Sequence, residues 1–138
     1  MQTLHFLHCS KLVSVTTQNH GEVRYEADNF ILASGNFFSK GLVSDIDGVY
    51  EPVFGLDMDY ISERPEWYKR NMFEAQPYMN FGVSTGEDFK TMKNGEIIDN
   101  LYAAGAVLSG FNALKEGSGA GISFLTALHV SSLILGGK

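Results

Sequence analysis

Polar and apolar residues alternate in two neighbouring stretches near the start of the chain, residues 11–17 and residues 22–26. Alternation with a period of two is typical of β-strands that are buried on one face. Between the two stretches, residues 19–21 (Asn-His-Gly) supply turn-forming side chains. We therefore predict a β-hairpin, which ends where residues 28–29 (Asp-Asn) interrupt the pattern.

A wholly apolar run, Phe30–Ala33, follows the hairpin and leads into Ser34 and Gly35. Runs of this kind are typical of strands that are buried on both faces of a parallel sheet. Small residues at the end of such a strand leave room for another group beside the backbone. We therefore expect Ser34 and Gly35 to lie where a ligand can approach.

The last third of the chain continues with a strand, a glycine-rich turn and a helix. Leu101–Ala104 is a second apolar strand, and Ala120–Leu135 is apolar nearly all round, which predicts a buried helix that Gly136 and Gly137 terminate. Five of the fifteen glycines lie between the strand and the helix or open the helix: Gly105, Gly110, Gly117, Gly119 and Gly121. A glycine-lined turn that leads into a helix N-terminus is suited to hold the electron-rich edge of a cofactor.

The middle of the chain has a weaker pattern, with strong turn signals at residues 47–48 (Asp-Gly) and 94–95 (Asn-Gly). Ser62 is placed to cap a helical turn over residues 63–70 that has Pro65 in its first turn. Two further short strands are predicted, at residues 80–84 and 96–98.

The length of 138 residues fits one domain, for which we predict the α/β class, or α+β for the chain taken alone. Residues 1–44 would form the β-hairpin and the first core strand. Residues 45–99 would be an insertion or lid, and residues 100–138 the closing strand, the glycine-rich loop and the last helix.

Acidic residues gather in the middle of the chain. The net charge is −6, and residues 45–74 alone hold eight acids and three bases, a net of −5. We interpret these acids as a solvated face, because they lack the spacing of a calcium-binding loop. The rest of the chain is nearly neutral and has no basic stripe, which argues against nucleic-acid binding.

Cysteine usage and the apolar segments exclude further classes of protein. Cys9 is the only cysteine, so no internal disulfide can form. The uncharged window 117–137 contains an apolar part of only about 14 residues, fewer than the 20 or so that span a bilayer. No transmembrane segment is therefore predicted, and His5, His8 and Lys11 interrupt any signal-peptide core.

The glycine-rich turn departs from the dinucleotide-binding fingerprint G-x-G-x-x-G. In residues 117–121 (Gly-Ser-Gly-Ala-Gly) the third glycine would have to be residue 122, which is Ile122. Two alternatives remain for these glycines. They serve close helix packing, or they form a different loop that contacts a flavin, which is the interpretation we prefer.

Other candidate residues favour structural roles. His5 and His8 lie three apart on a predicted strand and face opposite sides, so they cannot chelate one metal with Cys9, and no metal site is predicted. His129 lies within the apolar helix and is interpreted as a core histidine. Aromatic side chains either line a pocket or fill the core: Phe37, Phe38, Trp67, Tyr68 and Tyr78. No serine lies in the G-x-S-x-G motif of hydrolases, and no residue stands out as a catalytic base.

Two segments resemble the two-dinucleotide-binding-domain flavoproteins. Residues 22–39 (EVRYEADNFILASGNFFS) resemble their β-hairpin and the strand A-D-x-h-h-L-A-[ST]-G that follows it. Residues 100–135 resemble their closing strand, flavin loop and last helix. More particular segments resemble the family of B subunits of anaerobic glycerol-3-phosphate dehydrogenases: residues 51–57, 66–69 and 76–85.

The resemblance implies the C-terminal part of a Rossmann-like flavin-binding domain, with FMN as the cofactor and FAD as the alternative. It implies that nine residues face the flavin: Ser34, Gly35, Gly105, Ala106, Gly117, Ser118, Gly119, Ala120 and Gly121. The N-terminus of the last helix would lie near the pyrimidine edge of the flavin. Many relatives have Asp or Glu where this chain has Ala106, so contacts to the ribityl chain would have to come from the backbone.

The resemblance also implies a subunit of a respiratory dehydrogenase that oxidises sn-glycerol 3-phosphate to dihydroxyacetone phosphate and passes electrons to quinone, in anaerobic respiration with fumarate or nitrate. The implied partners are a flavin-bearing A subunit and a membrane-associated iron–sulfur C subunit, at the cytoplasmic face of the inner membrane. The alternatives are another flavoprotein oxidoreductase, such as a fumarate-reductase-like enzyme, and a non-catalytic assembly or electron-relay module.

Members of this family begin with a strand–G-x-G-x-x-G–helix unit, which this sequence lacks, so we expect the chain to be the C-terminal third of a larger subunit. We expect the chain by itself to bind flavin poorly and to show no turnover. We also expect it to self-associate through uncovered strand edges and apolar faces.

Overall fold

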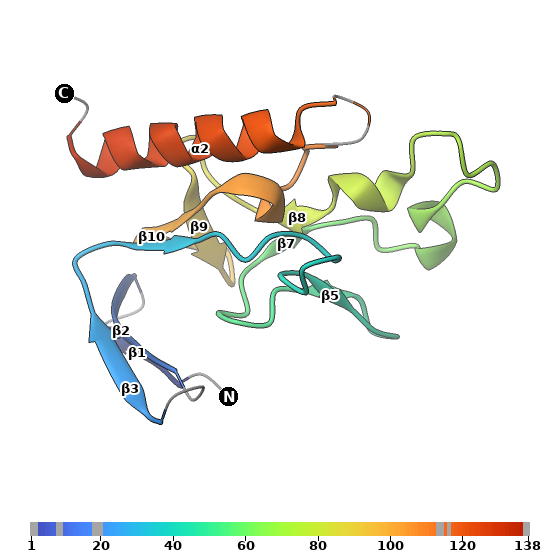
Figure 1. The fold of residues 1–138 in the computed structure, drawn as a ribbon. Coiled ribbons are helices and arrows are strands. Elements are labelled where there is room, and N and C mark those ends of the chain that lie inside the picture. The colour runs from blue at the N-terminus through green and yellow to red at the C-terminus, as the bar shows by residue number, and fades with distance from the viewer. Residues whose placement is uncertain (1–2, 8–9, 18–20, 113–114, 116, 137–138) are drawn as a thin grey trace.

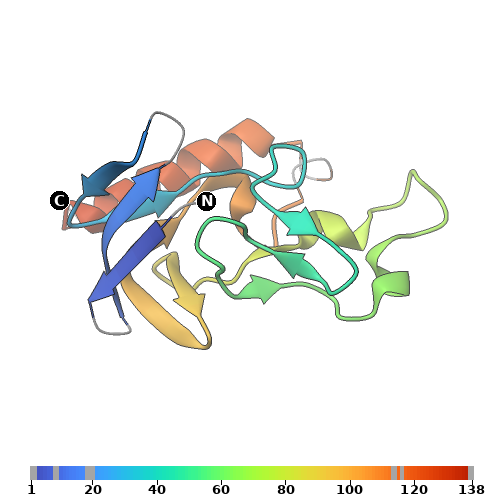
Figure 2. The ribbon, with the colours of Figure 1, turned by 90° about the horizontal axis from the view of Figure 1, so that it is seen from below.

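The computed structural model of the protein describes residues 3–7, 10–17, 21–112, 115 and 117–136. Its elements fall into three parts (Figure 1): a three-stranded sheet at one end, a central sheet covered by one long helix, and an irregular region at the other end. The view from below shows the same three parts along the molecule (Figure 2). Sheets with both parallel and antiparallel pairs, together with the helix, agree with the predicted α/β class.

The predicted parallel pair of strands is present in the central sheet. β4 (Phe30–Leu32) lies parallel to β10 (Glu96–Ala103), and the strand order is β4–β10–β9. β10 is continuous, so the two strands predicted at residues 96–98 and 101–104 are one element.

A tight hairpin joins β9 (Lys90–Lys93) to β10. Its turn residues Asn94 and Gly95 have φ angles of 55° and 78°, the left-handed values that a two-residue hairpin turn requires. The Asp57 carboxylate accepts hydrogen bonds from both turn amides, at 2.8 and 2.7 Å. The Asn-Gly turn prediction is therefore confirmed, and Asp57 holds the turn.

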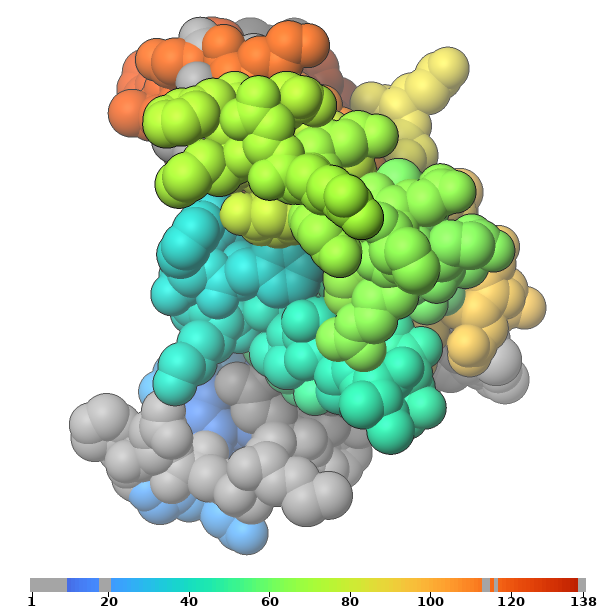
Figure 3. All heavy atoms as spheres, turned by 90° about the vertical axis from the view of Figure 1, so that its right-hand side faces the viewer, coloured from blue at the N-terminus to red at the C-terminus, as the bar shows by residue number. Residues whose placement is uncertain are grey.

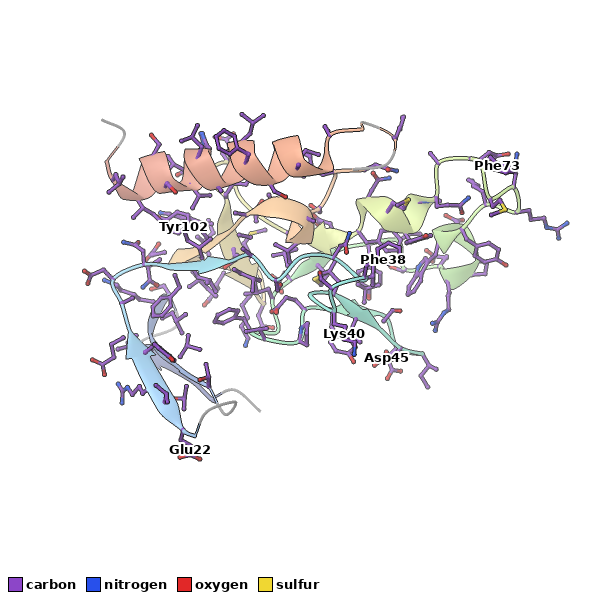
Figure 4. All side chains as sticks on the ribbon, viewed as in Figure 1. Glu22, Phe38, Lys40, Asp45, Phe73 and Tyr102 are labelled. Atoms are coloured by element: carbon purple, nitrogen blue, oxygen red, sulfur yellow. The ribbon has the colours of Figure 1, made fainter. Side chains whose placement is uncertain are left out.

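One long helix, α2 (Gly119–Ile134), crosses one face of the central sheet. Val130 is fully buried and packs with Tyr102 and Ala104 of the sheet, and Tyr102 lies between sheet and helix in Figure 4. The outer side of the helix is exposed, by 68%, 64% and 58% for Phe124, Leu125 and Leu128. The prediction of a helix buried all round is therefore wrong in this structure, because a helix on a single sheet buries only the side that faces the sheet.

The end of α2 and the edge of the sheet settle two smaller expectations. Gly136 has a φ of 81° and donates its N–H to the Leu133 carbonyl at 3.1 Å, which confirms a glycine stop, whereas Gly137 lies outside the described residues. Ile31 is exposed, so β4 is buried on one face only, because it is an edge strand. Within the described part of the chain, no helix has both the length and the apolarity needed to cross a bilayer.

The predicted β-hairpin is also present, within an antiparallel sheet of three strands. β1 (Thr3–Leu7), β2 (Lys11–Thr17) and β3 (Val23–Glu26) pair in that order. Residues 19 and 20 of the predicted turn lie outside the described residues.

The buried side chain of Asn100 joins this outer sheet to the central one by hydrogen bonds. The Asn100 amide accepts the N–H of Leu12 at 2.9 Å and donates to the carbonyl of Leu12 at 2.7 Å. It also donates to the carbonyl of Asp28 at 2.8 Å. Asn100 therefore pairs backbone groups that would otherwise be buried without partners.

Residues 43–83 form the irregular region of short elements at the other end. These elements are β5 (Val43–Ser44), β6 (Val49–Tyr50), β7 (Met58–Asp59), η1 (Arg64–Trp67), η2 (Pro77–Asn80) and β8 (Gly82–Val83). β5 and β6 form a hairpin closed by a 3.0 Å bond from the Asp45 N–H to the Gly48 carbonyl, which confirms the Asp-Gly turn. The predicted Ser62 cap is wrong: η1 spans four residues, and its N-cap is Glu63 without a side-chain bond.

The acidic residues of this region are not all solvated. Glu51 is 1% exposed, and its carboxylate accepts backbone N–H bonds from Val53 and Phe54 at 2.7 Å and from Gly55 at 3.1 Å. The expectation of a solvated face is therefore wrong for Glu51. Its charge is stabilised by three backbone donors that converge on one turn.

Candidate functional site

A pocket opens beside the carboxyl ends of β4 and β10, where the irregular region meets α2. Its walls come from the turn after β4, from η2, from the short helix η3 (Gly105–Val107) and from the first turn of α2. The lining includes Asn36, Phe37, Tyr78, Ala106, Gly119 and Ile122. In Figure 3 the cyan segment near residue 40 and the green segment of residues 70–80 lie on two sides of this hollow, with orange residues of α2 above.

The structure brings part of the predicted flavin-facing set together. Ala106 and Gly119 line the pocket, and Ser34 and Gly35 directly precede its lining residue Asn36. Four more of the predicted residues adjoin lining residues along the chain without lining the pocket themselves: Gly105, Ser118, Ala120 and Gly121. Gly117 is exposed and neither lines the pocket nor adjoins a lining residue. Parallel strands end at the same edge of a sheet, which explains why segments 70 residues apart meet here.

Ser34 offers an unused hydroxyl group next to the pocket. Its Oγ is buried and has no hydrogen-bond partner among the described residues. Its carbonyl accepts a bond from the Ser39 hydroxyl at 3.0 Å, which fixes the turn. A buried hydroxyl without a partner is costly, so this atom is suited to bond with a ligand.

The turn after β4 needs glycine at two positions. Gly35 has a φ of 83°, and a side chain there would collide with Ser39. A side chain at Gly41 would collide with the backbone of Ser34 and Gly35. This part of the pocket is therefore shaped by backbone packed against backbone.

The turn after β10 is fixed from α2. Gly105 is buried with a φ of 77°, and its N–H donates to the Thr126 hydroxyl at 2.9 Å. The sequence signal for Thr126 was weak, because a threonine in an apolar helix normally bonds its own backbone. The next residue, Ala106, is exposed and lines the pocket.

The N-terminus of α2 faces the same pocket through Gly119. Ser118 is the N-cap residue, but among the described residues no side chain bonds to this helix end, and the first turn contains no acidic residue. The first backbone N–H groups of a helix have no partner inside it, and the helix dipole gives this end partial positive charge. The first turn of α2 can therefore stabilise an electron-rich group.

Aromatic rings form the opposite wall. Phe37 and Tyr78 meet edge to face with centroids 6.4 Å apart, and Phe38 lines the pocket while remaining 81% exposed. Trp67 does not line the pocket, and its ring packs 5.6 Å from that of the lining residue Phe81 and against that of Tyr60. Of the five predicted aromatics, three thus line the pocket, Trp67 packs internally and Tyr68 is exposed.

The sequence matches the family model described as FAD binding domain over residues 5–122. The chain belongs to this family of FAD-binding domains. It is 41% identical over 127 residues to the B subunit of anaerobic glycerol-3-phosphate dehydrogenase from Aliivibrio fischeri (strain MJ11), an alignment that covers 91% of this chain and 28% of the relative.

Proteins of the same name from two other bacteria are similar. The Pectobacterium carotovorum protein is 46% identical over 89% of this chain and 29% of its own length, and the Yersinia enterocolitica protein is 40% identical over 91% and 30%. The chain therefore spans about three tenths of the curated relatives that it matches. No solved structure matches it.

The residues of this FAD-binding domain fit a flavin edge. A flat, electron-rich ring system suits a pocket with aromatic side chains on one wall and an uncapped helix N-terminus on the other. The Ser34 hydroxyl is buried without a partner among the described residues, two positions before the lining residue Asn36. The side chain of Ala106 has no hydrogen-bonding group, so at this position only the backbone can offer one.

The remaining candidates for chemistry lie elsewhere in the domain. His129 is exposed on α2 with its ring 5.4 Å from that of Phe89, so the prediction of a core histidine is wrong: it lies on the part of the helix that the sheet does not cover. No group of three metal-ligating side chains occurs among the described residues. The side chain of His5, together with His8 and Cys9, lies outside the described part, so their predicted structural role stays a prediction.

Proposed function

We propose that this FAD-binding domain holds the isoalloxazine ring of a flavin in a dehydrogenase. The observation that carries the proposal is the meeting of β4, β10 and the uncapped α2 N-terminus at one aromatic pocket, in a chain of this family. When bound, a flavin would supply two-electron redox chemistry, and the helix N-terminus would favour the negative charge of its reduced ring.

We propose that the flavin is held by the set predicted from the sequence: Ser34, Gly35, Gly105, Ala106 and residues 117–121. Ser34 would donate its free hydroxyl proton, and the first turn of α2 would supply backbone donors. FMN remains our proposed cofactor, and FAD is the alternative that the description of the family favours. Acid extraction followed by mass spectrometry of the released flavin distinguishes the two.

The proposed reaction of the complete protein is oxidation of sn-glycerol 3-phosphate to dihydroxyacetone phosphate, with the electrons passed towards quinone. The names of the relatives support this substrate and assembly with other subunits. We propose as partners a flavin-bearing A subunit and an iron–sulfur C subunit that holds the complex at the cytoplasmic face of the inner membrane. Residues 45–99 would act as an insertion or lid over the site.

Anaerobic mixing of the complete natural protein and its partners with sn-glycerol 3-phosphate tests the proposal. We expect the visible flavin absorption to bleach with glycerol 3-phosphate and to stay unchanged with glycerol. Bleaching by succinate or an amine instead would identify another oxidoreductase on the same scaffold. A purified protein that assembles with its partners but contains no flavin would identify an assembly or relay module.

A further inference from the structure

The Thr126 hydroxyl on α2 forms a hydrogen bond to a residue outside the helix. Thr126 is buried, its Oγ1 donates to the Ile122 carbonyl at 2.7 Å, and it accepts the N–H of Gly105 at 2.9 Å. A hydroxyl has one proton and two lone pairs, so donation to Ile122 turns the lone pairs towards Gly105. The bond within the helix therefore orients the Thr126 oxygen so that it can accept the N–H of Gly105.

This hydrogen bond joins two walls of the pocket. Gly105 begins the turn in a left-handed conformation, and Ala106, the next residue, lines the pocket. Gly119 and Ile122 line the pocket from the helix that carries Thr126. One buried hydroxyl thus bonds the turn to the helix whose first turn lines the pocket.

We propose that Thr126 is a positioning residue for the flavin, acting through the backbone of Gly105 and Ala106. The inference rests on the proposed function, because it assigns to this hydroxyl the spacing of two groups that would contact the ring. Without the bond, the Gly105 N–H is buried without a partner, and the turn is free to move away from the helix.

Another buried threonine supplies a matched control. Thr91 on β9 is fully buried, and its Oγ1 donates to the Leu101 carbonyl at 3.1 Å, but it does not line the pocket. Thr126→Val and Thr91→Val each remove one buried hydroxyl at nearly constant volume. Thr126→Ser keeps the hydroxyl and removes only a methyl group, so it serves as the rescue variant.

The test measures flavin affinity and thermal unfolding for the three variants in the complete natural protein. We expect Thr126→Val to weaken flavin binding about tenfold relative to Thr91→Val and to shift the visible flavin spectrum, whereas Thr126→Ser stays close to wild type. Equal flavin affinity in Thr126→Val and Thr91→Val, or no rescue by serine, would overturn the proposal.

Hydrogen–deuterium exchange of residues 100–108 in the flavin-free protein separates this proposal from the proposed function. We expect faster exchange in Thr126→Val than in Thr91→Val, with wild-type exchange in Thr126→Ser. Unchanged exchange in Thr126→Val would refute the positioning role of Thr126 even if flavin binds. A wild-type protein that never holds flavin would refute the proposed function and, with it, the flavin-positioning role. Faster exchange in Thr126→Val would in that case still establish that the hydrogen bond holds the turn.

Discussion

The two walls of the pocket are built in different ways. The backbone wall consists of glycine and small residues at the strand ends and helix start, packed so closely that an added side chain at Gly35 or Gly41 would collide. The aromatic wall consists of Phe37, Phe38 and Tyr78, of which Phe37 and Tyr78 meet edge to face. The difference teaches that the backbone wall has no room for an added carbon at Gly41, whereas the aromatic wall should tolerate replacement by similar volume.

The two walls also depend on different supports. Thr126 and the central sheet hold the backbone wall. In the irregular region, the Gln76 amide accepts the Lys69 N–H at 2.7 Å and donates to two carbonyls of the loop at 3.0 Å, so that Phe73 is held at an exposed tip (Figure 4). Polar side chains bonded to backbone therefore brace the region that carries Tyr78.

The largest effect should follow from adding one methyl group to the backbone wall. Gly41→Ala would push a carbon into the backbone of Ser34 and Gly35, and we expect it to lower the free energy of unfolding by about 2–3 kcal/mol. Gly86→Ala is the control, since an added Cβ there meets nothing within 4 Å. Urea denaturation of both variants tests the difference, and equal midpoints would show that the wall is not tightly packed.

The next effect concerns the support of the irregular region. Glu51→Ala leaves three backbone N–H groups without their acceptor, and we expect a loss of about 2 kcal/mol. Glu63→Ala changes an exposed acid nearby and should stay within about 0.5 kcal/mol of wild type. Thermal unfolding of the two variants provides the measurement, and a neutral Glu51→Ala would mean that the turn holds without the carboxylate.

A smaller effect is expected from the aromatic wall. Tyr78→Leu keeps an apolar side chain but loses the edge contact with Phe37, which predicts flavin binding weaker by about 1 kcal/mol, or roughly fivefold. Tyr68→Leu, at an exposed tyrosine outside the pocket, should bind flavin as the wild type does. Flavin titration of the complete natural protein compares them, and equal affinities would remove the aromatic wall from the site.

The smallest effect on folding should come from the outer face of α2. Leu125→Ser with Leu128→Ser should reduce self-association of the 138-residue chain while changing its stability by about 0.5 kcal/mol or less. Ile46→Ser, at a residue 89% exposed on the β5–β6 turn, is the control and should leave association unchanged. Sedimentation velocity over a range of concentrations measures this, and a wild-type monomer at high concentration would contradict the expectation.

Local patterns in the sequence predicted the elements that define the backbone wall. Alternation located the β-hairpin, the Asn94-Gly95 pair located the turn before β10, and the apolar run located α2 to within one residue at each end. Each of these signals arises within about 20 residues, where turn chemistry and hydrophobic period act directly. The resemblance of residues 100–135 then indicated where the glycines would face a ligand.

The interactions that brace the site could not be predicted in this way. Glu51 looked like one more solvated acid, and its burial depends on a turn that folds back over it. Thr126 looked like a neutral position in an apolar helix, and its role depends on Gly105, 21 residues earlier. The exposure of the outer side of α2 and of His129 could not be predicted either, because the hydrophobic period of a sequence does not say how many sheets or helices cover an element.

The central claim is that the turn at Gly105 holds the flavin, and a matched pair of glycines tests it most directly. Gly105 and Gly95 have φ of 77° and 78°, so Gly105→Ala and Gly95→Ala carry the same backbone strain, roughly 1–2 kcal/mol. Gly105 directly precedes Ala106 of the pocket lining, whereas Gly95 lies in the β9–β10 turn, away from the lining residues. The flavin content per protein is then measured in the complete natural protein and in both variants. We predict that Gly105→Ala loses flavin and Gly95→Ala retains it; equal flavin content in the two variants would contradict the account.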